Sequence, residues 1–311
     1  MARIVFMGTP EFAVPALLAL DENHQVVSVV TQPDRRAGRG QKVMASPVKE
    51  AALERGLPLF QPDTLRTAEP LARLVDWRPD LIVVAAFGQI LRRPVLRLPP
   101  YGCLNVHASL LPRYRGAAPI SAAILAGDPV TGVTIMRMDE GMDTGPILAQ
   151  AQCPIAADDT TASLTAKLAE LGSQLLIETL PAWLAGEIAA RPQDDAQATY
   201  CRPLSKEDGC LDWTQPATYL DRQVRACFPW PGAYTTWEGK LLKVLHARPV
   251  TGWEVEEEPG AVVELETGGL AVAAGQGVLE LLEVQLAGKK PMAAAPFARG
   301  QRHLVGSALG A

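Results

Sequence analysis

The sequence has no feature that marks a secreted, membrane-spanning or disulfide-stabilised protein. Its first residues, 1–6, lack the apolar core of a signal peptide, and no apolar run approaches the roughly 18 residues of a membrane span. The chain has 5 cysteines, an odd number, and none of them forms a Cys-x-x-Cys pair, which disfavours both a disulfide framework and a zinc site. We therefore expect a cytoplasmic protein with reduced thiols and no metal.

The sequence also lacks the glycine fingerprint of dinucleotide-binding proteins. The strand expected over Arg3 to Met7 is followed by Gly8-Thr9-Pro10-Glu11-Phe12, which does not match Gly-x-Gly-x-x-Gly. Two of the glycines that let a backbone approach pyrophosphate are missing, so a nicotinamide dehydrogenase is disfavoured. Because Pro10 stands where a helix tolerates proline, we expect a helix to follow, through about Leu20.

What is present is an ordinary globular composition, with 48% hydrophobic and 20% charged residues. Short β-branched runs alternate with helical patterns, which is typical of a parallel α/β sheet. The first part therefore predicts a Rossmann-like, doubly wound, mostly parallel sheet. Its expected strands cover residues 3–7, 26–31, 80–87, 103–107, 132–138 and 147–154, and a long helix is expected over residues 160–184.

A chain of 311 residues is long enough for two domains. The segment from about Gly186 to Leu204 is irregular and predicts a linker. Beyond it the pattern changes to one helix over 216–227 and short strands punctuated by glycines, which predicts a smaller β-barrel. We expect an α/β domain over 1–188, a linker over 189–204 and the barrel domain over 205–311.

Asn105 and His107 belong to the short strand expected over Cys103 to His107. Side chains alternate along a strand, so these two residues point to the same side. The amide of Asn105 can donate to an oxyanion, and the imidazole of His107 can move a proton near neutral pH. Alone, the pair could be an ordinary polar strand end. Cys103 could be proposed as a nucleophile, but a cysteine in a strand is commonly a small buried hydrophobe.

Asp143 lies in the segment Asp139-Glu140-Gly141-Met142-Asp143-Thr144-Gly145, between two expected strands. Gly141 and Gly145 permit the positive φ angles of a sharp turn, so the carboxylate is held on a tight loop. By itself Asp143 could be a residue that only stabilises the turn. It could also orient the imidazole of His107 or relay its proton.

The run from Asn105 to Pro119, which includes Asn-Val-His-Ala-Ser-Leu-Leu-Pro, resembles the signature of the folate-dependent formyltransferases. The resemblance implies that Asn105, His107 and Asp143 are catalytic, that 10-formyltetrahydrofolate is the cosubstrate and that no metal is required. The segment Ala86 to Leu91 is similar to a run that lines the folate pocket of the family, with Phe87 in place of a tyrosine. The implied folate-binding residues are Ser109, Leu110, Leu111, Pro112, Phe87, Gly88, Gln89, Ile90, Asp139 and Gly141.

A basic segment at about residues 32–46 is the element that distinguishes one branch of this family from another. Between Asp34 and Lys49 it carries five basic residues and one acidic residue, a local net of +4 in a chain whose net charge is −5. Such a flexible loop could simply be solvated, but basic loops also attract phosphate backbones. It resembles the insertion with which the tRNA-formylating branch of the family contacts the acceptor stem. The residues implied in that contact are Arg35, Arg36, Arg39 and Lys42.

The run Phe228-Pro229-Trp230-Pro231-Gly232-Ala233-Tyr234 resembles the OB-like, tRNA-binding C-terminal barrel of the same branch, and we expect Trp230 and Tyr234 in its core. Residues 205–311 hold ten Lys and Arg against thirteen Asp and Glu, a net of −3, which speaks against RNA binding by the whole domain. A basic stripe of Arg222, Arg225, Lys240 and Lys243 could still face tRNA.

These resemblances imply a monomeric enzyme that transfers a formyl group from 10-formyltetrahydrofolate to the α-amine of methionyl initiator tRNA. A related enzyme acting on an amino sugar nucleotide or a purine precursor is the alternative, and the basic insertion argues against it. A non-enzymatic RNA-binding protein is the second alternative, which the intact set of Asn105, His107 and Asp143 disfavours.

Overall fold

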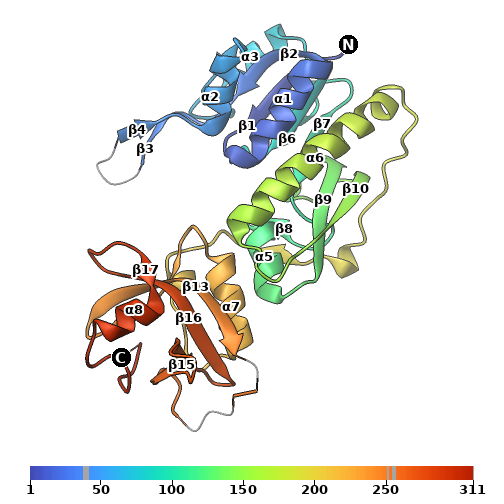
Figure 1. Ribbon diagram of the computed structural model, residues 1–311. Helices are drawn as coiled ribbons and strands as arrows, with labels where there is room; N and C mark the ends of the chain where they lie inside the picture. Colours follow the sequence, from blue (N-terminus) through green and yellow to red (C-terminus); the bar gives the residue numbers. More distant parts are fainter. Residues whose placement is uncertain (38–41, 251, 254–256, 311) are drawn as a thin grey trace. The chain divides into compact units, whose positions relative to one another are not determined.

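The structure is a computed structural model that describes residues 1–37, 42–250, 252–253 and 257–310 (Figure 1). Its contacts group the chain into two compact units. The first contains Met1–Pro119, Val130–Pro154 and Thr165–Cys201, and the second contains Ile120–Pro129, Ile155–Leu164 and Arg202–Ala311. The domain limits predicted from the sequence, with a linker over 189–204, remain a prediction. No helix among the described residues is both long and apolar enough to span a bilayer.

The first unit contains a 7-stranded sheet in the order β10-β9-β7-β6-β1-β2-β5. Neighbours from β7 to β5 are parallel, whereas β9 is antiparallel to both β7 and β10. This arrangement confirms the mostly parallel, Rossmann-like sheet expected from the sequence. The strands are β1 (Arg3–Gly8), β2 (Gln25–Val30), β5 (Leu59–Phe60), β6 (Leu81–Ala85), β7 (Cys103–His107), β9 (Val130–Arg137) and β10 (Ile147–Pro154).

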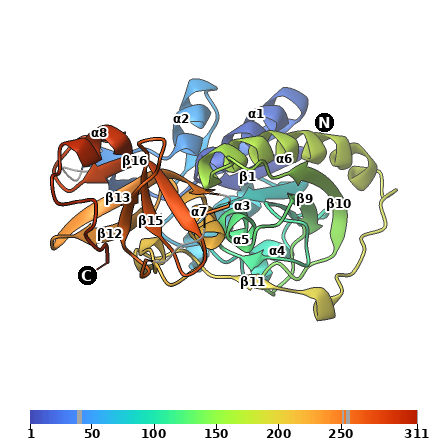
Figure 2. The same cartoon turned by 60° about the horizontal axis from the view of Figure 1, so that its bottom comes forward.

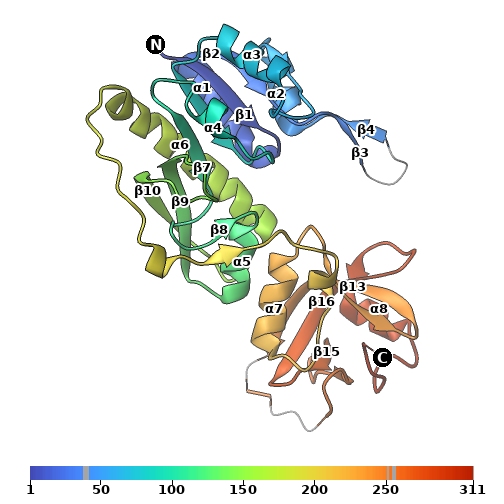
Figure 3. The same ribbon diagram turned by 180° about the vertical axis from the view of Figure 1, so that it is seen from behind.

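Helices cover both faces of this sheet. Gly172 of α6 approaches the side chains of Val106 and Val133, so α6 packs against β7 and β9 on one face (Figure 1). The thiol of Cys103, which points to the opposite face, contacts the carbonyl of Val95 in α4. Figure 3 shows the sheet from the side of α4. The helical segments here are η1 (Glu11–Ala13), α1 (Val14–Asn23), α2 (Pro47–Glu54), α3 (Ala68–Asp76), α4 (Arg93–Leu96), α6 (Thr161–Leu184) and η2 (Asp195–Gln197).

Several expected elements differ from the observed ones by one to three residues at their ends, among them the first helix and the strand β6. The first helix continues past Leu20 to Asn23. The strand expected over residues 80–87 ends at Ala85, because Ala86 has a φ of 46° and so leaves the extended conformation. The chain therefore turns at the carboxyl end of β6, where ligands bind in open α/β sheets.

The basic segment forms a hairpin where the sequence predicted only a loop. β3 (Arg35–Ala37) pairs with β4 (Lys42–Met44) in an antiparallel ladder, with Arg35 opposite Met44 (Figure 1). Arg39 lies outside the described residues, and so do the side chains of Arg35, Arg36 and Lys42. The expected loop is therefore corrected only in its backbone, where cross-strand hydrogen bonds join β3 to β4.

The second unit contains an antiparallel sheet in the order β12-β13-β16-β15-β14, with β17 paired to β16 (Figure 2). This curled sheet corresponds to the OB-like domain expected from the sequence. Its strands are β12 (Ala233–Trp237), β13 (Lys240–Val250), β14 (Val262–Glu264), β15 (Leu270–Ala273), β16 (Val278–Leu286) and β17 (Met292–Ala293). Its helical segments are α5 (Pro119–Ala126), η3 (Glu207–Gly209), α7 (Ala217–Ala226) and α8 (Ala294–Arg299).

The aromatic core of this unit differs from the expected one. Trp213 and Trp237 are buried, and the ring of Trp237 meets Phe297 of α8 edge to face at 6.1 Å. Trp230, which we expected in the core, is 55% exposed, and Tyr234 is half-buried. The expectation for Trp230 was therefore wrong: the core tryptophans of this unit include Trp213 and Trp237 but not Trp230.

Candidate active site

Strand β7 carries Asn105 and His107 on the face of the sheet opposite α6, as alternation predicts. Asn105 lies opposite Met136 of β9, and His107 lies opposite Thr134. Both polar side chains are nearly covered, with exposed fractions of 9% and 6%. Buried polar groups need hydrogen-bond partners, so the partners of these two residues define the site.

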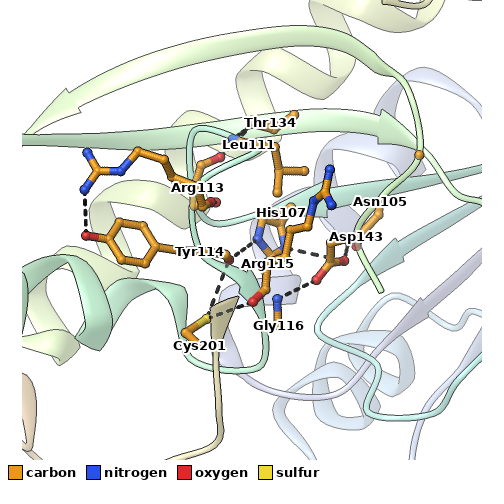
Figure 4. A network of polar contacts seen from close by, with 12 residues as sticks. Asn105, His107, Leu111, Arg113, Tyr114, Arg115, Gly116, Thr134, Asp143 and Cys201 are labelled. Carbon is orange, nitrogen blue, oxygen red and sulfur yellow. Dashed lines mark hydrogen bonds and ion pairs between the residues drawn. The ribbon is translucent and has the colours of Figure 1, made fainter. Parts of the chain in front are cut away.

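Asp143 is the partner that both residues share (Figure 4). Its Oδ1 lies 3.4 Å from Nδ2 of Asn105, which donates to it, and 3.7 Å from Nδ1 of His107. Its Oδ2 accepts a hydrogen bond of 2.8 Å from the backbone N–H of Gly116. The structure therefore brings together the three residues that the sequence proposed as catalytic, although Asp143 lies far from the other two in the chain.

Asp143 has a φ of 54°, a left-handed conformation that is unusual for a residue other than glycine. The turn around it is tight: a Cβ added at Gly145 would lie 1.8 Å from the carbonyl oxygen of Arg137. Asp139 stabilises the turn, since its Oδ1 accepts from the N–H of Gly141 at 3.0 Å and from the hydroxyl of Thr144 at 2.7 Å. The expected positive φ angles at Gly141 and Gly145 were wrong, because the left-handed conformation of this turn falls on Asp143 itself. Gly145 is needed for the close approach to Arg137 and not for its φ.

The imidazole of His107 is oriented by the segment that follows β7. Its Nε2 lies 3.0 Å from the carbonyl oxygen of Tyr114. A carbonyl can only accept, so Nε2 carries a hydrogen and Nδ1 is the nitrogen that faces Asp143. Nδ1 is consequently the position at which a proton can be gained or lost beside the carboxylate.

The predicted folate loop, Ser109 to Pro112, is anchored through Thr134. The hydroxyl of Thr134 donates to the carbonyl of Ser109 at 2.6 Å and accepts from the N–H of Leu111 at 3.1 Å. The amide of Gln150 donates to the carbonyl of Leu111 at 2.9 Å. Sequence reasoning missed Thr134 and Gln150, whose only signal is a polar side chain within an expected strand.

The segment from Phe87 to Ile90 mixes packing and exposed positions. The ring of Phe87 is 2% exposed inside an apolar cluster, so it needs no hydroxyl there. Gln89 holds the chain around Leu65, whose N–H donates to its Oε1 at 3.1 Å. Gly88 has a φ of 83°, and Ile90 is 71% exposed. Of the predicted folate-binding residues here, Ile90 presents the most side-chain surface.

The four cations of the second unit that were predicted to bind tRNA fall into two groups, two arginines bonded within the unit and two lysines on β13. Arg225 is mostly buried and forms an ion pair with Asp221 at 2.9 Å, while its Nη1 donates to the carbonyl of Asp159. Arg222 donates to the carbonyl of Ala126 at 3.2 Å. Both arginines therefore hold the unit together. Lys240 is exposed and Lys243 is half-buried, at an odd spacing along β13 that places them on opposite faces.

Two known family models match the chain. The model described as formyl transferase matches residues 2–180, and the one described as formyl transferase, C-terminal domain, matches residues 203–302. A methionyl-tRNA formyltransferase of Roseiflexus castenholzii is 52% identical over 310 residues, 99% of each chain, and that of Pseudomonas paraeruginosa is 50% identical over 311 residues, also 99% of each. The chain belongs to the methionyl-tRNA formyltransferase family. The resemblance noted in the sequence is confirmed.

Solved structures show the same fold at lower identity. An N-formyltransferase from Helicobacter canadensis, in complex with folinic acid and dTDP-3-aminofucose, matches with a TM-score of 0.67 at 18% identity, over 90% of this chain and 98% of that one. HypX from Aquifex aeolicus, in complex with tetrahydrofolic acid, matches with a TM-score of 0.62 at 19% identity, over 98% of this chain and 48% of that one. At these identities the likeness establishes the fold alone.

Cys103 is a structural residue in this formyltransferase fold. Burial raises the pKa of its thiol to about 12, so at pH 8 only about one molecule in 10⁴ carries the thiolate. We expect Cys103→Ala to keep its rate of formyl transfer. In the native protein, iodoacetamide at pH 8 should alkylate the exposed Cys210 and leave Cys103 unmodified, as peptide mass spectrometry would record. A folded Cys103→Ala variant without activity would contradict this assignment.

Proposed function

We propose that this protein transfers the formyl group of 10-formyltetrahydrofolate to the α-amino group of methionyl initiator tRNA. The observation that carries the proposal is the meeting of Asn105, His107 and Asp143 at the end of β7. An amide donor, an imidazole and a carboxylate are the groups that acyl transfer to an amine requires. Relatives with this name share about half of their residues with the chain over nearly its full length.

The proposed chemistry is direct attack. The lone pair of the neutral amine forms a C–N bond to the formyl carbon, and the carbonyl electrons move to oxygen, which gives a tetrahedral intermediate. The bond from that carbon to N10 of the folate then breaks. The amine loses one proton and N10 gains one, so the transfer releases no net proton. Each protein group has to act on the oxyanion or on the moving proton.

Asn105 and His107 would take these two tasks. Nδ2 of Asn105 would donate to the oxyanion, a contribution of roughly 3 to 4 kcal/mol for one such donor. His107 would donate to the same intermediate or carry the proton, and Asp143 would orient and stabilise its imidazole. All three side chains are mostly buried, which strengthens the electrostatic interactions among them.

We propose that the folate lies along residues 109–112, with Ile90, Asp139 and Gly141 nearby. Ser109 and Leu111 are fixed by Thr134 and Gln150, which gives the loop one conformation before a ligand arrives. Half-buried Leu110 and Pro112 and exposed Ile90 offer apolar surface that suits a flat heteroaromatic ring. These features fit the cosubstrate that the family resemblance implies.

The hairpin β3–β4 and exposed lysines of the second unit are the surfaces that we propose for tRNA. The hairpin segment carries Arg35, Arg36, Arg39 and Lys42, whose charges favour a phosphate backbone. In the second unit Lys240 is exposed, as are Lys289 and Lys290 after β16. We do not include Arg222 and Arg225, because their guanidinium groups already bind within the unit.

A formyl-transfer assay on charged tRNA tests the function. With 10-formyltetrahydrofolate, we expect rapid formylation of initiator methionyl-tRNA and little of elongator methionyl-tRNA. An amino sugar nucleotide such as dTDP-3-aminofucose is the control acceptor. Activity on the sugar and not on initiator tRNA would overturn the proposal. We also propose that the protein acts as a monomer in the cytoplasm, which sedimentation of the purified chain and its location in fractionated cells would test.

A further inference from the structure

The segment from Arg191 to Cys201 contacts both parts of the candidate active site. We call it the strap. At one end, the backbones of Arg191 and Ile147 form an antiparallel bridge, just after the turn that holds Asp143. At the other end, β11 (Tyr200–Cys201) pairs with β8 (Arg115–Gly116), which follows His107 and its loop. The strap therefore joins two stretches of chain whose relative position sets the geometry of the catalytic groups.

Gln193 of the strap binds the Asp143 turn through its amide nitrogen. Its Nε2 donates to the carbonyl of Asp143 at 2.8 Å and to the carbonyl of Gly145 at 2.7 Å. Both N–H groups of the side-chain amide are thus used on the backbone of one turn. That turn includes Asp143, whose left-handed backbone conformation persists only where surrounding contacts hold it.

The oxygen of Gln193 faces Arg115. Oε1 accepts from Nε of Arg115 at 3.1 Å and from Nη2 at 2.9 Å. Arg115 is 1% exposed, and its Nη2 also pairs with Asp195 of the strap at 2.7 Å. The next residue, Gly116, donates its N–H to the carboxylate of Asp143. Gly116 thus binds the carboxylate of Asp143 directly, and Arg115 binds the Asp143 turn through Gln193.

We propose that Gln193 is a positioning residue for formyl transfer: it fixes the backbone of the Asp143 turn, and hence the carboxylate, against Asn105 and His107. The proposal rests on the proposed function of this site. Gln193 does not contact the reacting atoms. It acts by holding Asp143 where Oδ1 lies between Nδ2 of Asn105 and Nδ1 of His107.

The substitution Gln193→Glu separates this role from a purely structural one. The carboxylate keeps the oxygen that accepts both hydrogen bonds from Arg115 and adds a charge, so the contact between the strap and Arg115 is preserved. It loses both donors and sets an oxygen against the carbonyls of Asp143 and Gly145. Gln193→Met removes both contacts. Gln197→Ala is the matched control, because among the described residues the amide of Gln197 donates within the strap, to Asp194 at 2.8 Å.

We expect Gln193→Glu to lower kcat by about 10 to 100-fold, since a misplacement of about 1 Å remote from the reacting atoms can cost about that much. Its KM for methionyl-tRNA, its binding of 5-formyltetrahydrofolate and its Tm should stay near those of the wild type. Gln193→Met should lose a similar factor in kcat and also lower Tm. Gln197→Ala should match the wild type in every measurement.

Two results would overturn the inference. One is a kcat in Gln193→Glu that equals that of the wild type. The other is a lower kcat in Gln193→Glu that is accompanied by a lower Tm and by weaker binding of 5-formyltetrahydrofolate. A wild-type protein that formylates no methionyl-tRNA would instead contradict the proposed function. A failure of the proposed function would appear in the wild-type assay, whereas a failure of the inference about Gln193 would appear only in the comparison of the variant with an active wild type.

Discussion

Asn105→Ala is expected to lower kcat for formyl transfer by about 10² to 10³-fold, with little change in KM for either substrate. Nδ2 of Asn105 is the side-chain donor next to His107 on the buried face of β7. In the resting protein it makes a long hydrogen bond of 3.4 Å to Asp143, so donation to an oxyanion costs little existing bonding. Single-turnover formylation of methionyl-tRNA would measure the loss.

The control for this prediction is Asn23→Ala, which removes an exposed asparagine whose amide only caps the end of α1. Both variants should bind 5-formyltetrahydrofolate as the wild type does. A folded Asn105→Ala variant within about threefold of the wild-type rate would exclude Asn105 as the oxyanion donor, because a single donor of this kind is worth roughly 3 kcal/mol.

The alternation of side chains in β7 made half of this site predictable. Five residues with a period of two place Asn105 and His107 on one face whatever the rest of the chain does. Asp143 was different, because local geometry predicts only that it lies on a tight turn. Its approach to His107 depends on the antiparallel pairing of β7 with β9, after which the Asp143 turn begins. The sequence suggested this contact only through the family resemblance.

The parts that the sequence did not predict depend on tertiary contacts without a local period. Gln193 lies in a stretch expected to be a linker, and nothing in its neighbourhood points to the turn 48 to 50 residues earlier in the chain. Thr134 is one of two threonines in β9, and nothing in the strand singles it out. Side-chain amides and hydroxyls can reach backbone in many directions, so their partners follow from the fold and not from spacing.

The partner of Arg225 could have been predicted from the sequence. Asp221 and Arg225 are spaced i, i+4 in a predicted helix, the separation at which opposite charges meet. That spacing favours an internal ion pair over a free cation for RNA. The exposed position of Trp230, in contrast, could not be read locally. Trp213 and Trp237 belong to the buried core and Trp230 does not, and this difference depends on the fold and not on spacing.

His107→Ala is expected to have the other large effect, a loss of about 10² to 10⁴-fold in kcat, the range for a positioned group that moves a proton. The imidazole is 6% exposed, and it is fixed at Nε2 by Tyr114 and faced at Nδ1 by Asp143. Its removal leaves the oxyanion donor of Asn105 in place, so slow transfer should persist. His303→Ala, at an exposed position of the second unit, is the matched control and should retain the wild-type rate.

Combining His107→Ala with Asp143→Ala tests whether the carboxylate acts through the imidazole. If Asp143 only orients and stabilises His107, the double variant should be about as slow as the slower single variant, because groups that act as a unit are not additive. Losses that multiply would show that Asp143 has a separate task, such as holding Asn105 through its 3.4 Å contact. A His107→Ala variant that folds, binds 5-formyltetrahydrofolate and formylates at the wild-type rate would remove the imidazole from the reaction altogether.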